Sequence, residues 1–144
     1  MRYNFFFLVI FLLLLAVFFP VFWVDKLQIG NRVFEVVIVD NEESRYRGLS
    51  GYEKLPNCAG MLFVHDTPGR YKYVMRGMKF DLDFVFIKED VVIDIVKNVS
   101  KNNPQKIIEG DGLYNMILEV PAGCIDDFNI KVNMKVRRFR EFRL

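Results

Sequence analysis

The chain has 144 residues, of which 52% are hydrophobic and 26% charged, and its formal net charge is +2. Hydrophobic residues are concentrated at the amino terminus, where they make up 21 of the first 24 positions, and the rest has the composition of an ordinary globular domain. The length after this segment suffices for one domain with its own core and is too short for two. Composition excludes a disordered chain, a polytopic channel, a collagen-like chain and a disulfide-dense miniprotein.

The amino-terminal segment has no charged residue between Arg2 and Asp25, a span of 22 residues. As a helix it would be about 33 Å long, enough to cross the roughly 30 Å of bilayer hydrocarbon. We therefore predict one transmembrane helix in an uncleaved anchor, residues 1–24, followed by a domain at 25–144. The alternatives are a cleaved signal peptide, for which the small residues of a cleavage site are lacking before Asp25, and a buried helix of a soluble protein.

The charges that flank this segment predict the orientation. Arg2 favours a cytoplasmic amino terminus, while Asp25 and Lys26 cancel on the other side. We therefore expect a single-pass protein of the cell membrane with its domain outside the cytoplasm. Asp25 and Lys26 alone separate Val24 from the first predicted strand, so the domain is expected close to the membrane surface.

Alternating polarity and short apolar runs, bounded by glycine and asparagine, predict β structure after residue 26. In chain order, the predicted strands are 27–29, 33–39, 61–65, 71–75, 82–87, 91–96, 107–108, 114–120 and 131–142. Turns at Gly30-Asn31 and at residues 88–90 predict two hairpins. A short helix is expected after Asn41, which would cap it, and a helical turn at 125–128. About eight strands with one or two short helices predict a mainly β fold, a compact β-barrel-like or sandwich domain.

Several short motifs follow one another along this domain. They are Arg47-Gly48-Leu49, Gly60-Met61-Leu62-Phe63, Met75, Leu82-Asp83 with Phe86-Ile87, and Leu118-Glu119-Val120-Pro121-Ala122-Gly123. With these motifs in this order, residues 33–136 resemble the family known as domain of unknown function 192. The resemblance implies a small β-barrel-like or sandwich fold, usually behind a signal or anchor segment, and no established activity. The chain departs from the family pattern at Val74, where Trp is common, and at Asp81, where Pro is usual.

Three charged residues fall on these motifs: Arg47, Asp83 and Glu119. A guanidinium can bind a carboxylate through two hydrogen bonds, and charges on mostly apolar segments need partners. We expect the three to form a polar network that locks the short helix onto the sheet. The alternatives are a ligand or acid–base site built from the two carboxylates, and a divalent-cation site. We predict no metal and no cofactor.

The histidine and the cysteines predict no catalytic centre. His65 is the only histidine and follows an apolar run, without the sequence signature of a nucleophile, so we expect a hydrogen-bonded or solvent-facing side chain. Cys58 and Cys124 lack the spacing of a zinc site. Outside the cytoplasm they either form a disulfide or remain two separate thiols.

The carboxyl-terminal residues are basic. Residues 131–144 include six basic residues and one acidic residue, whereas residues 25–130 include 13 basic and 17 acidic residues. Basic and aromatic residues alternate as in some nucleic-acid-binding segments, but the predicted anchor places this tail away from nucleic acid, and we expect no such partner. A solvated strand end or contact with anionic headgroups are the two interpretations left.

Taken together, the sequence favours a membrane-proximal binding or accessory domain for a small ligand, peptide or envelope partner. The alternative is a hydrolase-like or other enzyme that uses Asp83, Glu119 and Arg47. An enzyme requires these carboxylates in an open pocket. Burial and pairing with Arg47 would instead indicate a structural role. A third interpretation, a structural part of a larger membrane assembly, requires a broad exposed apolar patch.

Overall fold

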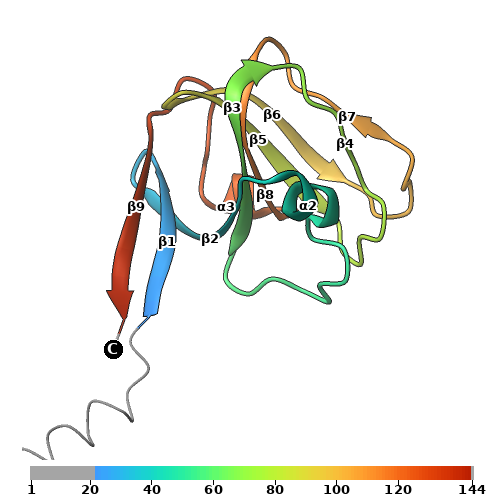
Figure 1. Ribbon diagram of the computed structural model, residues 1–144, viewed down its shortest axis with the longest axis horizontal. Coiled ribbons are helices and arrows are strands. Elements are labelled where there is room, and N and C mark those ends of the chain that lie inside the picture. Colours follow the sequence, from blue (N-terminus) through green and yellow to red (C-terminus); the bar gives the residue numbers. More distant parts are fainter. Residues whose placement is uncertain (1–21, 144) are drawn as a thin grey trace, which may run out of the picture.

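A computed structural model describes residues 22–143, so the predicted anchor lies outside the described residues up to residue 21. The described part is mainly β, as expected, with two short helices (Figure 1). The strands are β1 (Phe22–Ile29), β2 (Arg32–Val39), β3 (Gly60–Gly69), β4 (Tyr73–Val74), β5 (Leu82–Lys88), β6 (Val91–Val99), β7 (Ile107–Ile108), β8 (Tyr114–Pro121) and β9 (Val136–Arg143), and the helices are α2 (Glu42–Arg47) and α3 (Cys124–Asp127).

Seven strands form one sheet in the order β6-β5-β8-β3-β2-β1-β9, and β4 pairs with β7 in a second, small sheet. β2 and β3 are parallel, whereas β8 is antiparallel to both of its neighbours, β5 and β3. The expected barrel is not closed. β6 meets the segment before β9 through one isolated bridge, between Val91 and Lys135, and within residues 22–143 no ladder joins the two edge strands β6 and β9.

The two predicted hairpins are confirmed. Ile29 pairs with Arg32 across the Gly30-Asn31 turn, and Lys88 pairs with Val91 across the next hairpin turn. The first strand starts earlier than predicted, because residues 22–24, expected as the end of the anchor, pair with β9 instead. Within residues 22–143, no helix has the length and apolar composition of a membrane span.

Side chains of the central strands alternate between two cores, one on each face of the large sheet. Leu118 and Val120 of β8 belong to the first core, and Ile117 belongs to the second. Because successive side chains of a strand point to opposite faces, Glu119 lies on the same face as Ile117. This face carries the candidate site.

A disulfide joins Cys58 to Cys124, so the loop before β3 is linked to α3. The two Cα atoms are 5.7 Å apart and are separated by 66 positions in the sequence. Of the two alternatives that the sequence leaves open for these cysteines, the disulfide is the one present in this structure.

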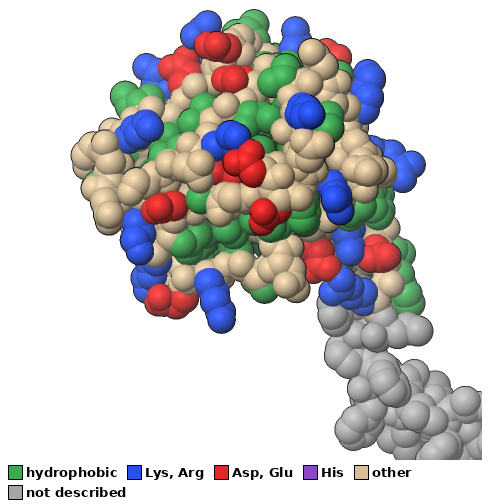
Figure 2. All heavy atoms as spheres, turned by 180° about the vertical axis from the view of Figure 1, so that it is seen from behind, with side chains coloured by type: hydrophobic (Ala, Val, Ile, Leu, Met, Phe, Trp, Pro, Cys, Tyr) green, Lys and Arg blue, Asp and Glu red, His purple; other side chains and the backbone are tan. Residues whose placement is uncertain are grey.

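Basic and acidic side chains are interspersed over the surface seen in Figure 2.

Candidate functional site

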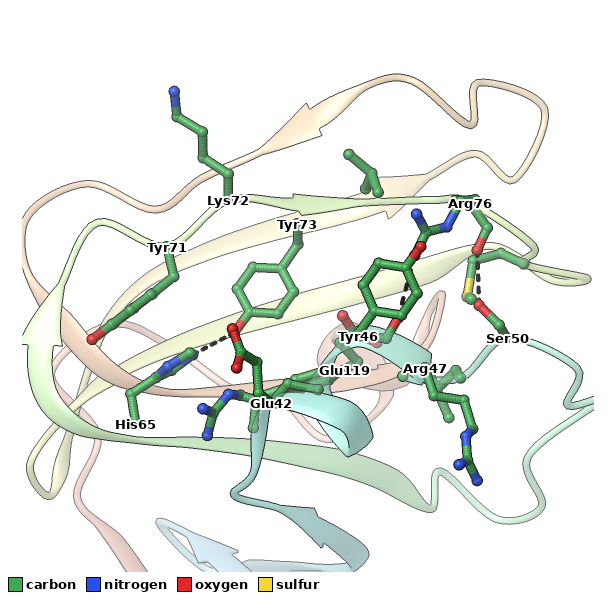
Figure 3. Close-up of a pocket in the computed structure, with 16 residues that line it drawn as sticks. Glu42, Tyr46, Arg47, Ser50, His65, Tyr71, Lys72, Tyr73, Arg76 and Glu119 are labelled. Carbon is green, nitrogen blue, oxygen red and sulfur yellow. Dashed lines mark hydrogen bonds between the residues drawn. The ribbon is translucent and has the colours of Figure 1, made fainter.

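A pocket of about 420 Å³ lies between α2, the Glu119 face of β3 and β8, and the segment 71–78 (Figure 3). It is lined by Glu42, Arg45, Tyr46, Arg47, Gly48, Leu49, Ser50, Phe63, His65, Tyr71, Lys72, Tyr73, Val74, Arg76, Met78 and Glu119. Four of these side chains are basic and two are acidic. Aromatic rings contribute much of the remaining wall, so the pocket combines apolar surface with a few polar groups, as small-molecule sites do.

Glu119 is the buried acid of the pocket. Its side chain is 5% exposed, and its neighbours on the same sheet face are apolar, among them Met61 and Phe84, which lie opposite it on β3 and β5. No residue within 22–143 forms a hydrogen bond or ion pair with the Glu119 carboxyl group. Burial raises the pKa of Glu119 to about 8, so the carboxyl group is mostly protonated at neutral pH.

His65 and Tyr73 form a second polar group of the pocket. A hydrogen bond of 2.8 Å joins His65 Nε2 to the Tyr73 hydroxyl, and the imidazole stacks on the Tyr71 ring at a centroid distance of 3.5 Å. Burial, assisted by the nearby Arg45 charge, lowers the pKa of His65 to about 4. Burial and the Glu119 carboxyl raise the pKa of Tyr73. Both groups are therefore neutral at pH 7.

The short helix α2 supplies the basic side of the pocket. The Asn41 side chain accepts a 2.9 Å hydrogen bond from the Ser44 backbone N–H, which confirms the predicted cap. Arg45 donates to the carbonyl oxygens of Asp40 and Val64, and so ties the helix to β3. The helix ends at Gly48, whose φ of +51° is a conformation that favours glycine.

Arg76 comes from the opposite wall. Its guanidinium lies 4.3 Å from the centroid of the Tyr46 ring and donates to the Tyr46 carbonyl oxygen. From the loop after α2, the Ser50 hydroxyl donates to the Arg76 carbonyl oxygen at 3.0 Å. These contacts hold the segment that carries Tyr73 and Arg76 against α2.

The three residues predicted as one network are not brought together. Arg47 lines the pocket but its guanidinium is exposed and pairs with Glu43, one helical turn earlier, at 3.0 Å. Asp83 is fully buried on the other face of the sheet, because it lies opposite Val120 and not opposite Glu119. It accepts hydrogen bonds from the backbone N–H groups of Asn98, Gly123 and Ile125. Asp83 is therefore a structural residue that holds the turn between β8 and α3.

The sequence predicts little of the pocket. It predicts a hydrogen-bonded or solvent-facing His65, and the structure shows the hydrogen bond, to Tyr73. It does not single out Tyr71 and Tyr73, although their spacing of two places both side chains on one face of an extended segment. Arg45 and Arg76 come from segments with no recognisable motif and meet the pocket only through tertiary packing. Among residues 22–143, no three His, Cys, Asp or Glu side chains are grouped as a metal site requires.

The protonation states of Glu119, His65 and Tyr73 determine what the pocket can bind. A protonated Glu119 can donate a hydrogen bond to a ligand acceptor, while basic side chains at the entrance attract negative charge. The hydroxyl beside His65 is that of Tyr73, and burial raises its pKa, which makes this phenol a poor nucleophile at neutral pH. The arrangement is suited to holding a small molecule.

Comparison with known proteins agrees with this fold. The family model of DUF192, described as Uncharacterized ACR, matches residues 25–138. A crystal structure of a protein of unknown function from Novosphingobium aromaticivorans DSM 12444 is similar with a TM-score of 0.74 and 22% identity, over 79% of this chain and 84% of that chain. A crystal structure from Sinorhizobium meliloti 1021, described as that of a proposed transcription regulator, is similar with a TM-score of 0.75 and 18% identity, over 81% of this chain and 94% of that chain.

These similarities to solved structures concern the fold alone at such low identity. No curated protein matches the sequence. The family match covers most of the chain and includes all the motifs noted in the sequence. The chain therefore belongs to the DUF192 family.

Proposed function

We propose that this protein is a membrane-anchored binding module that holds a small ligand in the pocket above Glu119. The observation that carries this proposal is the Glu119 carboxyl group, which lines the pocket, is almost buried and has no hydrogen-bond partner within residues 22–143. No side-chain polar atom that is sealed from solvent in these residues lacks a partner, so the Glu119 oxygens open onto the pocket, where a ligand can reach them. A ligand that enters the pocket would provide the missing hydrogen bond.

The charges of the pocket indicate the chemical class of this ligand. Basic side chains outnumber acidic ones along the lining, and Glu119 is mostly neutral at pH 7. We expect a small organic anion with a hydrogen-bond acceptor at its buried end and an apolar or planar body against Phe63 and Tyr73. Its negative charge would lie near Arg45, on the α2 side of the pocket.

The test is to purify the full-length protein from its native membrane and to identify co-purifying small molecules by mass spectrometry. Wild type is compared with Glu119→Leu, Glu119→Gln and, as a matched control, Glu89→Gln, which replaces an exposed acid in the β5–β6 turn. We expect one compound to be lost with Glu119→Leu and retained with Glu119→Gln and the control, because glutamine still donates a hydrogen bond.

Two outcomes contradict this proposal. Loss of the compound with Glu119→Gln as well would indicate a cationic ligand that needs an ionised Glu119. The same compounds in all four preparations would mean that the pocket holds no ligand of its own, and would leave a partner-binding role for other surfaces of the domain.

An acid–base enzyme is the second candidate, and one observation favours it. Glu119 and His65 line the same pocket, and burial shifts their pKa values in opposite directions, to about 8 and about 4. At neutral pH one is a protonated acid and the other an unprotonated base, as in many acid–base sites. If the bound compound is turned over, activity should be constant between about pH 4 and 8 and should be abolished in Glu119→Gln and reduced in His65→Gln. Binding without turnover would exclude this candidate.

A further inference from the structure

Two large aromatic side chains lie exposed together at one end of the ribbon formed by β1 and β9. Trp23 pairs with Phe142 in the β1–β9 register, and their ring centroids are 5.4 Å apart in an edge-to-face arrangement. Trp23 is 63% exposed and Phe142 is 49% exposed. In Figure 1 this ribbon stands away from the rest of the sheet, and these residues lie at its far end, where β1 begins and β9 ends. The pair thus forms an apolar tip without a cover from residues 22–143.

The same ribbon is rich in basic residues. β1 and β9 together have five basic and two acidic side chains. Arg140 pairs with Asp25 at 2.8 Å, and Arg143 pairs with Glu35 of β2, whereas no ion pair within residues 22–143 involves Arg138. Figure 2 shows hydrophobic and basic side chains, with some acidic ones among them, at the end of the molecule where the grey residues begin. An apolar tip with neighbouring arginines is complementary to an anionic bilayer surface.

In the sequence, the predicted transmembrane segment leads directly into this tip. The uncharged run from Tyr3 to Val24 continues into β1 without an intervening linker, since β1 begins at Phe22. Strand pairing then brings Phe142, which is 119 positions further along the chain than Trp23, to the same place. If the apolar run crosses the bilayer, both aromatic rings reach the headgroup region together.

We propose that the tip formed by Trp23 and Phe142 lies in the interfacial layer of an anionic bilayer, with Arg138, Arg140 and Arg143 near the headgroups. The ribbon then fixes the orientation of the domain on the membrane. Tryptophan and phenylalanine rings occupy this layer readily, and basic side chains add attraction to anionic lipid. This inference rests on the membrane anchor of the proposed function and is independent of its pocket.

The experiment uses the fact that Trp23 is the only tryptophan of the chain. The full-length protein is reconstituted into vesicles of phosphatidylcholine and phosphatidylglycerol, with acyl chains brominated close to the headgroup as quencher. The decisive variant is Trp23→Phe with Phe142→Trp, which moves the probe to the carboxyl-terminal strand. Its matched control is Trp23→Phe with Tyr46→Trp, which places the probe on α2, where residue 46 is 73% exposed.

We expect brominated lipid to remove most of the fluorescence of the residue-142 probe and of wild-type Trp23, and aqueous iodide to quench only the control probe. Quenching of the residue-142 probe by iodide and not by lipid would overturn the inference, even if Trp23 itself were quenched by lipid. Release of the protein by alkaline carbonate would overturn both the anchor and this inference. The pocket proposal is tested by co-purification of a small molecule, so its failure would leave these fluorescence signals unchanged.

A second quenching experiment tests whether the three arginines contact anionic headgroups. In vesicles of phosphatidylcholine alone, we expect weaker lipid quenching of the residue-142 probe, and the same weakening in anionic vesicles when Arg138, Arg140 and Arg143 are changed to Gln. A matched control changes three exposed lysines elsewhere, Lys54, Lys106 and Lys131, to Gln. Equal quenching in both lipid mixtures would overturn the assignment to anionic headgroups.

Discussion

Asp83 and Glu119 point to opposite faces of the same sheet. In the pairing of β5 with β8, Asp83 lies opposite Val120, and Glu119 lies opposite Phe84. A shift of one position in an antiparallel pair changes the face of a side chain, so these two carboxylates have separate roles. Asp83 is satisfied by backbone N–H groups, whereas Glu119 lines the pocket without a partner from residues 22–143.

The Asp83→Asn substitution should therefore destabilise the fold without changing ligand co-purification. An amide provides one acceptor oxygen and places an N–H group among backbone donors, so we expect a loss of about 3 kcal/mol in the free energy of unfolding. Urea unfolding of wild type and Asp83→Asn measures this difference in the free energy of unfolding. Asp127→Asn, at an exposed acid of α3, is the matched control and should have little effect. Equal stability of Asp83→Asn and wild type would contradict the structural role.

Stability should fall as the pH rises from 6.5 to 8, because of Glu119. The folded chain keeps the Glu119 proton up to a pKa of about 8, whereas the unfolded chain releases it near 4.5, so the folded state binds more protons in between and loses stability with rising pH. His65 acts in the opposite direction, but only between about pH 4 and its unperturbed value of 6.5. Between pH 6.5 and 8 we expect the free energy of unfolding to fall by about 2 kcal/mol.

Urea unfolding of wild type and Glu119→Gln at both ends of this window provides the measurement. The variant should show a much flatter dependence, since the chain has no second histidine and its cysteines are paired. A wild-type curve as flat as that of the variant would mean that Glu119 titrates at an ordinary pKa.

The pKa of His65 should be about 4 and should rise when Arg45 is replaced by Gln. Burial is the larger cause of the lowered pKa and persists in the variant, so the value should stay below 6.5. Because the chain has one histidine, its ring signals can be followed by NMR without assignment of others. Arg47→Gln, which removes an exposed charge paired with Glu43, is the control and should leave the titration unchanged.

Reduction of the disulfide between Cys58 and Cys124 should lower the free energy of unfolding by about 4 kcal/mol in the chain-entropy model, given the length of the loop it closes. Unfolding in urea with and without a reductant measures the difference. The double variant Cys58→Ser, Cys124→Ser should behave like the reduced protein and should not respond to reductant. A wild type that is insensitive to reductant would show that the bond does not contribute.

Gly60→Ala should destabilise the contact of β3 with β8. A Cβ atom at this position would lie 2.7 Å from the Glu119 carbonyl oxygen and 2.8 Å from Leu118 Cδ1, so the strands must move apart, at a cost of about 3 kcal/mol. Gly51→Ala is the comparison, because no heavy atom lies within 4 Å of its new Cβ and only backbone strain is added. Thermal unfolding should rank Gly60→Ala as clearly the less stable of the two variants.

Much of the fold was predictable because its signals are local. The Gly30-Asn31 turn fixes a hairpin between neighbouring strands, and the Asn41 cap starts a helix through a hydrogen bond three residues away. The motif order likewise identified the family that the match over residues 25–138 shows. The boundary of β1 was not predictable, since Trp23 is as apolar as the residues before it and is held in a strand by β9, from the other end of the chain.

By itself, the sequence determined the apolar amino-terminal run, the β-rich domain with its two hairpins, the family and the residues on its motifs. The tertiary structure decided which of these residues share a site. It placed Asp83 and Glu119 on opposite faces through the register of β5 and β8, and it brought His65, Tyr73 and Arg45 from three segments around Glu119. Strand register and the packing of a helix on a sheet depend on contacts between residues far apart in the chain, and those contacts have no local pattern in the sequence.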